Sequence, residues 1–286
     1  MTTEVEIIGD GWHEGGSDCA LKGRVRVVTF RLEYPRYIHS QLKTHRMFSS
    51  CSASSRAIPL DRMIEQVENN PAIPLWTMNQ PGMQGQRADM ETTSYACGEW
   101  LNAMKDAIYH VRELQALGIH KQDANRLLEP FMHIRTILTG TAEGLEHFFK
   151  LRIDEAAQPE INLLATKMRD AMEKSVPVNV PEGAWMTPYY GVTYASETIL
   201  KAVARCAQVS YRKDADDMET VQRVITRLVS GHALHASPFE HVWRPYPVAR
   251  CPGNLSYCRQ LRHVVEDWLQ EKSYEGVLRV LERFVR

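Results

Sequence analysis

Hydrophobic positions along the first part of the chain predict one long strand followed by several helices. Residues 23–35, "GRVRVVTFRLEYP", are rich in β-branched and aromatic residues and end on a proline, which is typical of a strand. In "EWLNAMKDAIYHVRELQALG" the apolar residues recur at helical spacing and stop before Gly118, which predicts a long core helix. Further helices are predicted over 37–48, 59–70, 121–138 with a bend at Pro130, 142–151 and 158–174.

The pattern changes after residue 174. Residues 175–192 carry several prolines and two glycines, which break regular structure and indicate a linker or an extended crossing segment. Helical patterning resumes near residue 197 and again over 220–234. "SPFEHVWRPYP" predicts a turn that enters a short strand, and residues 255–286 predict two terminal helices.

Composition limits the classes of function. The chain has 286 residues, 44% of them hydrophobic, and its 34 basic and 35 acidic side chains nearly cancel. Long-range attraction to nucleic acid or to an anionic membrane is therefore not expected, and any cationic site must be local. Six dispersed cysteines without a CxxC pair, and an N-terminus that lacks the build of a signal peptide, favour the reducing cytoplasm. No apolar run approaches the roughly 20 residues that span a bilayer.

The stretch "THRMFSSCSASSRAIP" at 44–59 is the first candidate site. Two arginines bracket five serines in it. Serine hydroxyls and backbone N–H groups can hold anionic oxygens, and the flanking guanidinium groups supply charge and forked donors. The stretch therefore suits a phosphate, although a solvated serine-rich loop between helices fits these residues equally well.

Two other groups of polar residues are weaker candidates. His232, His235, Glu240 and His241 are metal-ligand types, but their spacing matches no recognised metal motif, and neither does the Cys251 and Cys258 pair. We expect packing and hydrogen bonding there, and no metal site. Arg126 and Arg152 taken singly are typical of arginines that pair with carboxylates or lie at a helix C-terminus.

Four motifs taken together resemble the flavin-dependent thymidylate synthases. They are "Q-x-x-T-H-R-x-x-S-x-x-x-x-S-x-R" from Gln41, "R-x-x-x-P" from Arg126, "H-F-x-x-L-R-x-x-x-x-A-Q-x-E-I" from His147 and "H-x-S-P-F-E-H" from His235. The resemblance covers most of 27–172 and 204–244, and "NQPGMQ" at 79–84 is similar to a branch common in phages. The sequence departs from the family at Thr44, where arginine is usual, and at Cys51, where asparagine is usual.

The order of the motifs also departs from the family. "H-x-[ST]-P-F-E-H" normally precedes the arginine-rich signature, whereas here it follows some 190 residues later. The resemblance therefore implies a circularly permuted form of the family's α+β fold, with a mixed sheet packed against a largely helical region. We expect a single domain over 1–286: a core at 23–174, a linker at 175–192, a permuted segment at 193–245 and a C-terminal helical extension at 246–286.

The resemblance implies a C5 methyltransferase. It would convert dUMP to dTMP with methylene tetrahydrofolate as carbon donor, reduced FAD as hydride source and NADPH to regenerate the flavin. It also implies a homotetramer with small-molecule partners. From the cysteines and the net charge we expect it in the cytoplasm, or in the host cytoplasm if the chain is phage-encoded, with neither nucleic acid nor membrane as a partner. A pyrimidine nucleotide hydroxymethylase and a catalytically silent flavin- or nucleotide-binding protein are the alternatives.

The resemblance also assigns roles to individual residues. Arg152 matches the arginine that stabilises negative charge on the pyrimidine, so it is the predicted catalytic residue. The predicted substrate-binding residues are Gln41, Thr44, Ser52, Ser54, Ser55, Arg56, Arg126 and Arg152. The predicted flavin-binding residues are Thr44, His45, Arg46, Ser52, Thr141, Ala142, Glu143, His147, His235 and Ser237. A nucleophilic Cys51, by analogy with the unrelated thymidylate synthases that attack C6 with a thiolate, is a rival hypothesis, and a small buried cysteine is its simpler alternative.

Overall fold

The computed structural model describes residues 2–15, 23–82, 85–211, 217–230, 233–246 and 253–271. His232, Cys251, the end of "NQPGMQ" and the second predicted terminal helix lie outside these ranges. Within them, no helix combines the length and the apolar character needed to cross a membrane.

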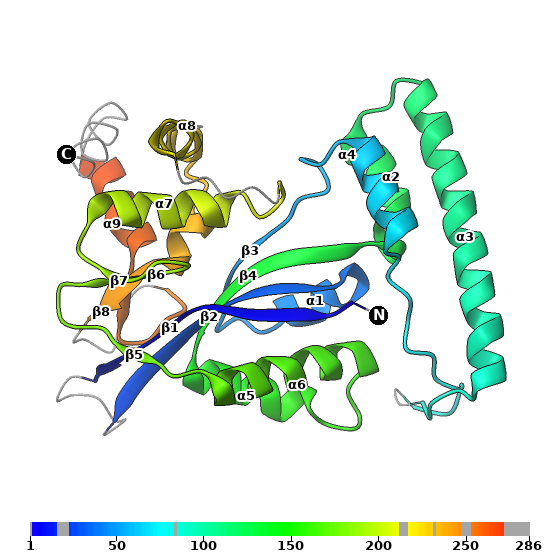
Figure 1. The fold of residues 1–286 in the computed structure, drawn as a ribbon, viewed down its shortest axis with the longest axis horizontal. Coiled ribbons are helices and arrows are strands. Elements are labelled where there is room, and N and C mark those ends of the chain that lie inside the picture. Colours follow the sequence, from blue (N-terminus) through cyan, green and yellow to red (C-terminus); the bar gives the residue numbers. More distant parts are fainter. Residues whose placement is uncertain are drawn as a thin grey trace.

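A five-stranded mixed sheet forms the centre of the molecule (Figure 1). The strands, in spatial order, are β3 (Ser49–Ser52), β4 (His133–Thr141), β2 (Arg24–Pro35), β1 (Glu4–Glu14) and β5 (Val178–Asn179). All neighbours pair antiparallel except β1 and β5, which are parallel. The sheet confirms the α+β class and the strand predicted at 23–35, while β1 was not anticipated.

The predicted helix over 121–138 is wrong in its second half. Only α4 (Lys121–Ala124) and a 3-10 segment (Asn125–Phe131) are helical, and β4 begins at His133. Pro130 cannot continue a helix, and the segment that follows it, which is rich in β-branched residues, pairs with β2 over nine consecutive positions. Pairing with a strand a hundred residues away therefore overrides the local helical pattern.

The predicted helix over 37–48 is also shorter than expected. A 3-10 turn (Arg36–Ile38) leads into α1 (His39–Lys43), after which the chain turns into β3. β3 pairs with β4 from Ser49 to Ser52, so part of the serine-rich stretch is a strand and not a loop. Side chains in a strand alternate between faces, which divides these serines into two sets.

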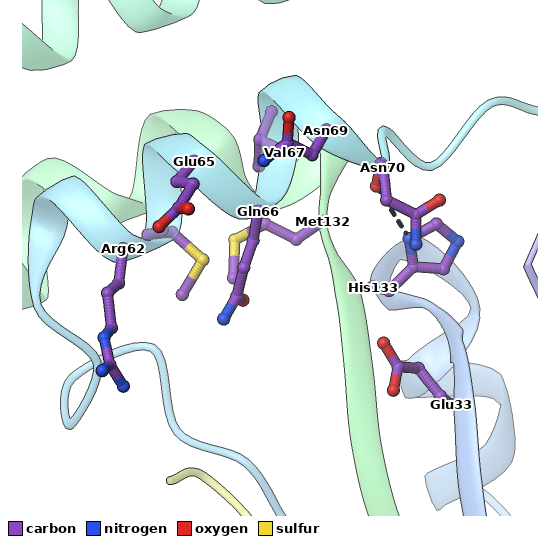
Figure 2. Close-up of a pocket in the computed structure, with 10 residues that line it drawn as sticks. Glu33, Arg62, Glu65, Gln66, Val67, Asn69, Asn70, Met132 and His133 are labelled. Atoms are coloured by element: carbon purple, nitrogen blue, oxygen red, sulfur yellow. Dashed lines mark hydrogen bonds between the residues drawn. The ribbon is translucent and has the colours of Figure 1, made fainter. Parts of the chain in front are cut away.

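The remaining predicted helices of the first part are confirmed. They are α2 (Leu60–Asn69), α3 (Met90–Ala116), α5 (Ala142–Arg152) and α6 (Pro159–Lys174). α3 begins earlier than predicted because Asp89 caps it by accepting from the backbone N–H of Thr92. α2 and α3 pack together beyond one end of the sheet (Figure 1). A cleft of about 400 Å³ lies between α2 and the ends of β2 and β4, and none of the predicted site residues lines it (Figure 2).

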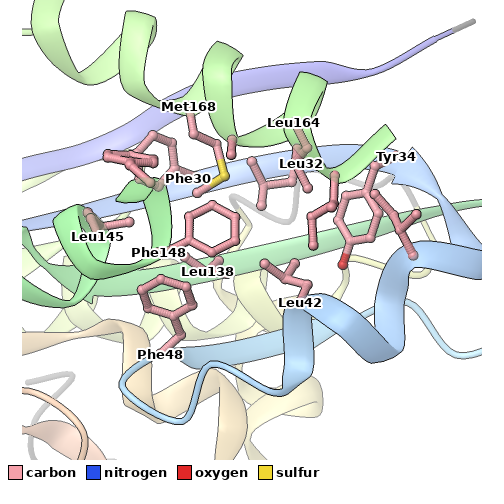
Figure 3. Packing of buried hydrophobic residues seen from close by; sticks show 14 of the residues in the cluster. Phe30, Leu32, Tyr34, Leu42, Phe48, Leu138, Leu145, Phe148, Leu164 and Met168 are labelled. Carbon is pink, nitrogen blue, oxygen red and sulfur yellow. The ribbon is translucent and has the colours of Figure 1, made fainter. Parts of the chain in front are cut away.

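α5 and α6 cover one face of the central sheet (Figure 1). Their apolar residues meet alternate positions of β2 and β4 in a cluster that contains Phe30, Leu138, Phe148 and Leu164, each nearly or fully inaccessible to solvent (Figure 3). Burying large side chains of this kind stabilises the fold by roughly 1.5–3 kcal/mol each. This core fixes α5 against the sheet.

The opposite face of the sheet packs against the last third of the chain. That region contains a second sheet in the order β7-β6-β8-β9, formed by Gly191–Thr193, Trp185–Thr187, Trp243–Pro245 and Cys258–Gln260. The predicted linker thus contributes strands to both sheets. The helical elements there are α7 (Ser196–Ala207), α8 (Met218–Val229), a 3-10 turn (Ser237–His241) and α9 (Leu261–Glu271).

Candidate functional site

Several of the predicted site residues lie on α5 or directly before it. This helix begins where β4 ends, and the Thr141 hydroxyl caps it by accepting from the backbone N–H of Gly144 at 3.3 Å. Eleven residues of helix span about 15 Å. The predicted flavin turn, Thr141 to Glu143, therefore lies at one end of α5 and Arg152 at the other, with the exposed His147 between them.

Arg152 joins two residues of the arginine-rich signature. Its Nε donates to His45 Nε2 at 2.9 Å, and one terminal nitrogen donates to Thr44 Oγ1 at 3.3 Å. Because a guanidinium can only donate, His45 Nε2 must accept, so the hydrogen of the neutral ring is on Nδ1. A second donor, the Nδ1–H of His45, is thus available beside the guanidinium.

Burial keeps His45 neutral. It lowers the pKa of His45 to about 4, and the nearby charges of Arg152 and His147 act in the same direction. The ring packs edge-on against Phe148, 4.8 Å between centroids, and this contact ties the site to the core beneath α5.

Gln41 completes this end of the site. Its backbone carbonyl accepts from the Thr44 hydroxyl at 2.7 Å, and its side-chain amide donates to Gln158. Gln158 was not predicted, although it is the "Q" of the "A-Q-x-E-I" motif. Lys43, which donates to the Ser50 hydroxyl, was also not predicted, although it directly precedes Thr44.

The serine-rich stretch divides between the two faces of the sheet. Ser52 lies on the α5 face, where its hydroxyl is 2.9 Å from that of Thr136. Ser49 and Cys51 lie on the opposite face: Gln260 donates to Ser49 Oγ, and the Cys51 thiol donates to the carbonyl of Cys206 on α7 at 3.6 Å. Within β3, only Ser50 and Ser52 therefore lie on the face of the sheet that carries α5 and Arg152, which is the predicted ligand side.

The stretch leaves the sheet after Ser52. The Ser54 backbone N–H donates to Ser210 Oγ at 3.0 Å, and the carbonyl of the buried Ser55 accepts from Asn125 at 2.7 Å. Asn125 directly precedes Arg126, so this contact brings the Arg126 segment to the loop that carries Arg56. Arg126 itself is exposed and ion-paired with Glu129 at 3.0 Å, and Arg56 and Arg46 are exposed.

A cleft of about 500 Å³ opens at the N-terminus of α5. Thr141, Ala142 and Glu143 line it, so all three residues of the predicted flavin turn face one cavity. Arg24 and Arg26 contribute cationic side chains, of which Arg26 is held by Asp10 at 2.6 and 2.9 Å. A helix N-terminus beside arginines attracts anionic groups.

The predicted flavin-binding residues of the "H-x-S-P-F-E-H" motif, His235 and Ser237, are not among the residues that line this cleft. His235 is exposed, and Ser237 forms a hydrogen bond with the Cys51 thiol, on the face of β3 that packs against α7. Burial raises the pKa of Cys51, and the thiol is nearly inaccessible. This geometry argues against a nucleophilic Cys51.

His241, from the same motif, is a fully buried polar residue. Its Nδ1 lies 2.9 Å from Thr139 Oγ1, and desolvation lowers its pKa to about 3. Among the described residues, no group of three or more His, Cys, Asp or Glu side chains could hold a metal ion.

We predict that the protein loses stability in mild acid through His241. The folded pKa lies below the unfolded value near 6.5, so only the unfolded state binds this proton between those values. The contribution of neutral His241 to the free energy of unfolding is complete above pH 6.5. It should fall by about 1.4 kcal/mol per pH unit as the pH drops below that value. Denaturant unfolding at pH 7, 6 and 5 measures the slope of the free energy of unfolding against pH. His241→Gln should reduce it, and an unchanged slope would contradict the assignment.

Comparison with known proteins gives one family and several relatives. The family model described as thymidylate synthase complementing protein matches residues 24–178, from the start of β2 to β5. A flavin-dependent thymidylate synthase of Pyrococcus furiosus is 33% identical over 147 residues, 51% of this chain and 54% of that protein. One from Pyrococcus abyssi is 32% identical over the same lengths. The chain thus spans about half the length of the curated relatives it matches.

A similar solved structure is the UMP/dUMP methylase PolB from Streptomyces cacaoi, bound with 5-Br UMP. It is 18% identical, with a TM-score of 0.47, and the match covers 60% of this chain and 89% of that one.

Proposed function

The chain belongs to the thymidylate synthase complementing protein family, and from this premise we propose that it methylates C5 of dUMP to form dTMP. Methylene tetrahydrofolate would donate the carbon, reduced FAD the hydride, and NADPH would regenerate the flavin. Support for this proposal comes from the family match across the central sheet and from relatives named flavin-dependent thymidylate synthases.

One observation carries the proposal: Arg152 meets Thr44 and His45, residues more than a hundred positions away, at the end of α5. Uracil C5 is a poor nucleophile unless negative charge can grow across N3, C4 and O4. A guanidinium positioned at that edge stabilises this charge as it forms. In the proposal Arg152 has this role, and its bond to His45 holds the planar group in a defined orientation.

The nucleotide would bind across the serine-rich stretch. Ser52, Ser54, Ser55 and Arg56, with Gln41 and Arg126, are the groups proposed to hold its phosphate and sugar. The contact between Ser55 and Asn125 supports this grouping, because it joins the two segments that carry Arg56 and Arg126. Lys43, bound to Ser50, adds a cation on the same side.

The flavin would lie along α5. The cleft at Thr141 to Glu143 offers a helix N-terminus and arginines to a diphosphate, and the Nδ1–H of His45 offers a hydrogen-bond donor about one helix length away. These residues fit an extended dinucleotide. When bound, the flavin supplies hydride transfer, while the protein binds and orients the reactants. Arg46, His147, His235 and Ser237 are proposed to complete this site.

The product identifies the reaction. Purified protein incubated with dUMP, methylene tetrahydrofolate and NADPH, with and without added FAD, should yield dTMP by mass spectrometry only when flavin is bound. A hydroxymethylated product would identify a hydroxymethylase. Flavin uptake, seen as a change in the visible spectrum at tens of micromolar FAD, without any product would identify a silent binding protein.

The permuted motif order and the assembly are part of the proposal. Trp243, just after "SPFEH", belongs to the same buried cluster as Val25 and Val27 at the start of β2, where the family sequence would continue directly. Pro245 and Tyr246 line a cleft with residues 12–14 of β1, which pairs with that same part of β2. These contacts support a single permuted domain. We further propose a cytoplasmic homotetramer, in which Ser237 of one subunit completes a pocket with His45 of another.

A further inference from the structure

A chain of hydroxyl groups connects His39 on α1 to Ser52 on β3. The Tyr34 hydroxyl lies 2.8 Å from His39 Nδ1 and 2.9 Å from Thr136 Oγ1. Thr136 Oγ1 lies 2.9 Å from Ser52 Oγ. Tyr34 and Thr136 are fully buried, whereas His39 and Ser52 are partly exposed (Tyr34 in Figure 3). The two ends are therefore linked through the interior of the α5 face.

The hydrogens in this chain can take only two arrangements. Burial raises the pKa of Tyr34, so its hydroxyl keeps its proton, and each of the three hydroxyls supplies one hydrogen. If every hydroxyl points toward His39, Ser52 donates to Thr136 and can only accept from a ligand. If every hydroxyl points toward Ser52, His39 Nδ1–H donates to Tyr34, and the Ser52 hydrogen is directed away from the chain.

We propose that Tyr34, Thr136 and His39 act as positioning residues that set Ser52 as a hydrogen-bond donor to a phosphate oxygen of the bound ligand. A phosphate oxygen accepts and does not donate, so a bound phosphate selects the second arrangement. The inference rests on the proposed function, which assigns Ser52 to the ligand side. The phosphate belongs either to the nucleotide or to the flavin dinucleotide.

The charges near this series of hydrogen-bonded hydroxyl groups favour an anion at Ser52. Lys43 donates to Ser50, which lies two residues before Ser52 on the same face of β3. Burial, with Arg36 and Lys43 nearby, lowers the pKa of His39 to about 4, so its ring is neutral at pH 7. His39 therefore sets the direction of the chain through its tautomer without adding a charge.

Removing the Thr136 hydroxyl tests the inference. Calorimetry should compare Thr136→Val with the unaltered protein for two ligand pairs, dUMP against deoxyuridine and FAD against riboflavin. We expect the phosphate-bearing member of one pair to bind about 3- to 10-fold more weakly, because Ser52 loses the hydrogen bond that orients it, and its phosphate-free partner to be unchanged. The pair that responds identifies the source of the phosphate, and Thr136→Ser should restore its affinity.

Thr139→Val is the matched control. It also removes a buried hydroxyl from β4, bonded to Thr29 and His241 and not to Ser52, so both affinity ratios should stay unchanged. Equal weakening of both members of a pair in Thr136→Val, or no weakening of any ligand, would overturn the inference. An unaltered protein that binds neither dUMP nor FAD overturns the proposed function itself, and the inference with it, before any variant is compared.

Discussion

Arg152→Lys is expected to slow methyl transfer to dUMP by about 10²- to 10³-fold, the usual cost of removing one preorganised electrostatic donor. Lysine keeps the positive charge but loses the planar fork that contacts His45 and Thr44 together. Reduction of the flavin by NADPH should survive, because in the proposed reaction that hydride donor meets the flavin and not the pyrimidine ring. Stopped-flow measurement of the two half-reactions separates these effects.

Arg112→Lys on α3 is the control for this substitution, since Arg112 is exposed and forms a long ion pair of 3.6 Å with Glu68, away from the predicted site residues. It should leave both half-reactions unchanged. If both collapse equally in Arg152→Lys, the charge-stabilising role assigned to Arg152 is wrong.

Phe148→Ala is expected to lower the free energy of unfolding by about 3–5 kcal/mol. Phe148 is fully buried between α5 and the sheet (Phe48 and Phe148 in Figure 3), and its ring contacts Phe48, Phe149 and His45. Truncation removes apolar surface from the core and leaves a cavity. Because Phe148 also supports the His45 ring, the folded variant should bind flavin more weakly as well.

Leu151→Ala, on the same helix, is the comparison for stability. Leu151 is 48% exposed, so its truncation should change the unfolding free energy by much less. Guanidinium unfolding of both variants measures the difference, and similar losses in the two would show that Phe148 is not central to this core.

The spacing of apolar residues and the residues at helix ends were enough to predict several elements of this fold. The helices α2, α5 and α6 lie within about two residues of their expected bounds, since spacing and helix-end residues act within the segment itself. The strand at β2 was predicted for the same reason. β4 was not, because its identity depends on pairing with β2, about a hundred residues earlier.

Cys51 illustrates the same limit within the candidate site. From the sequence, a cysteine among serines and arginines is compatible with either a reactive thiol or a small buried side chain. The register of β3 against β4 directs it toward α7, where burial raises its pKa. A shift of one position in that register would have exchanged it with its serine neighbours.

The residue types available for chemistry, the family resemblance of the four motifs and the helices formed by local periodicity all follow from the amino-acid sequence alone. Which of those residues meet depends on how the chain folds: Arg152 contacts Thr44 and His45, Asn125 contacts Ser55, and Ser52 contacts the buried hydroxyl of Thr136. The reason is physical. Helix periodicity is encoded over a few residues, whereas these contacts depend on strand pairing and core packing between segments about seventy to more than a hundred residues apart.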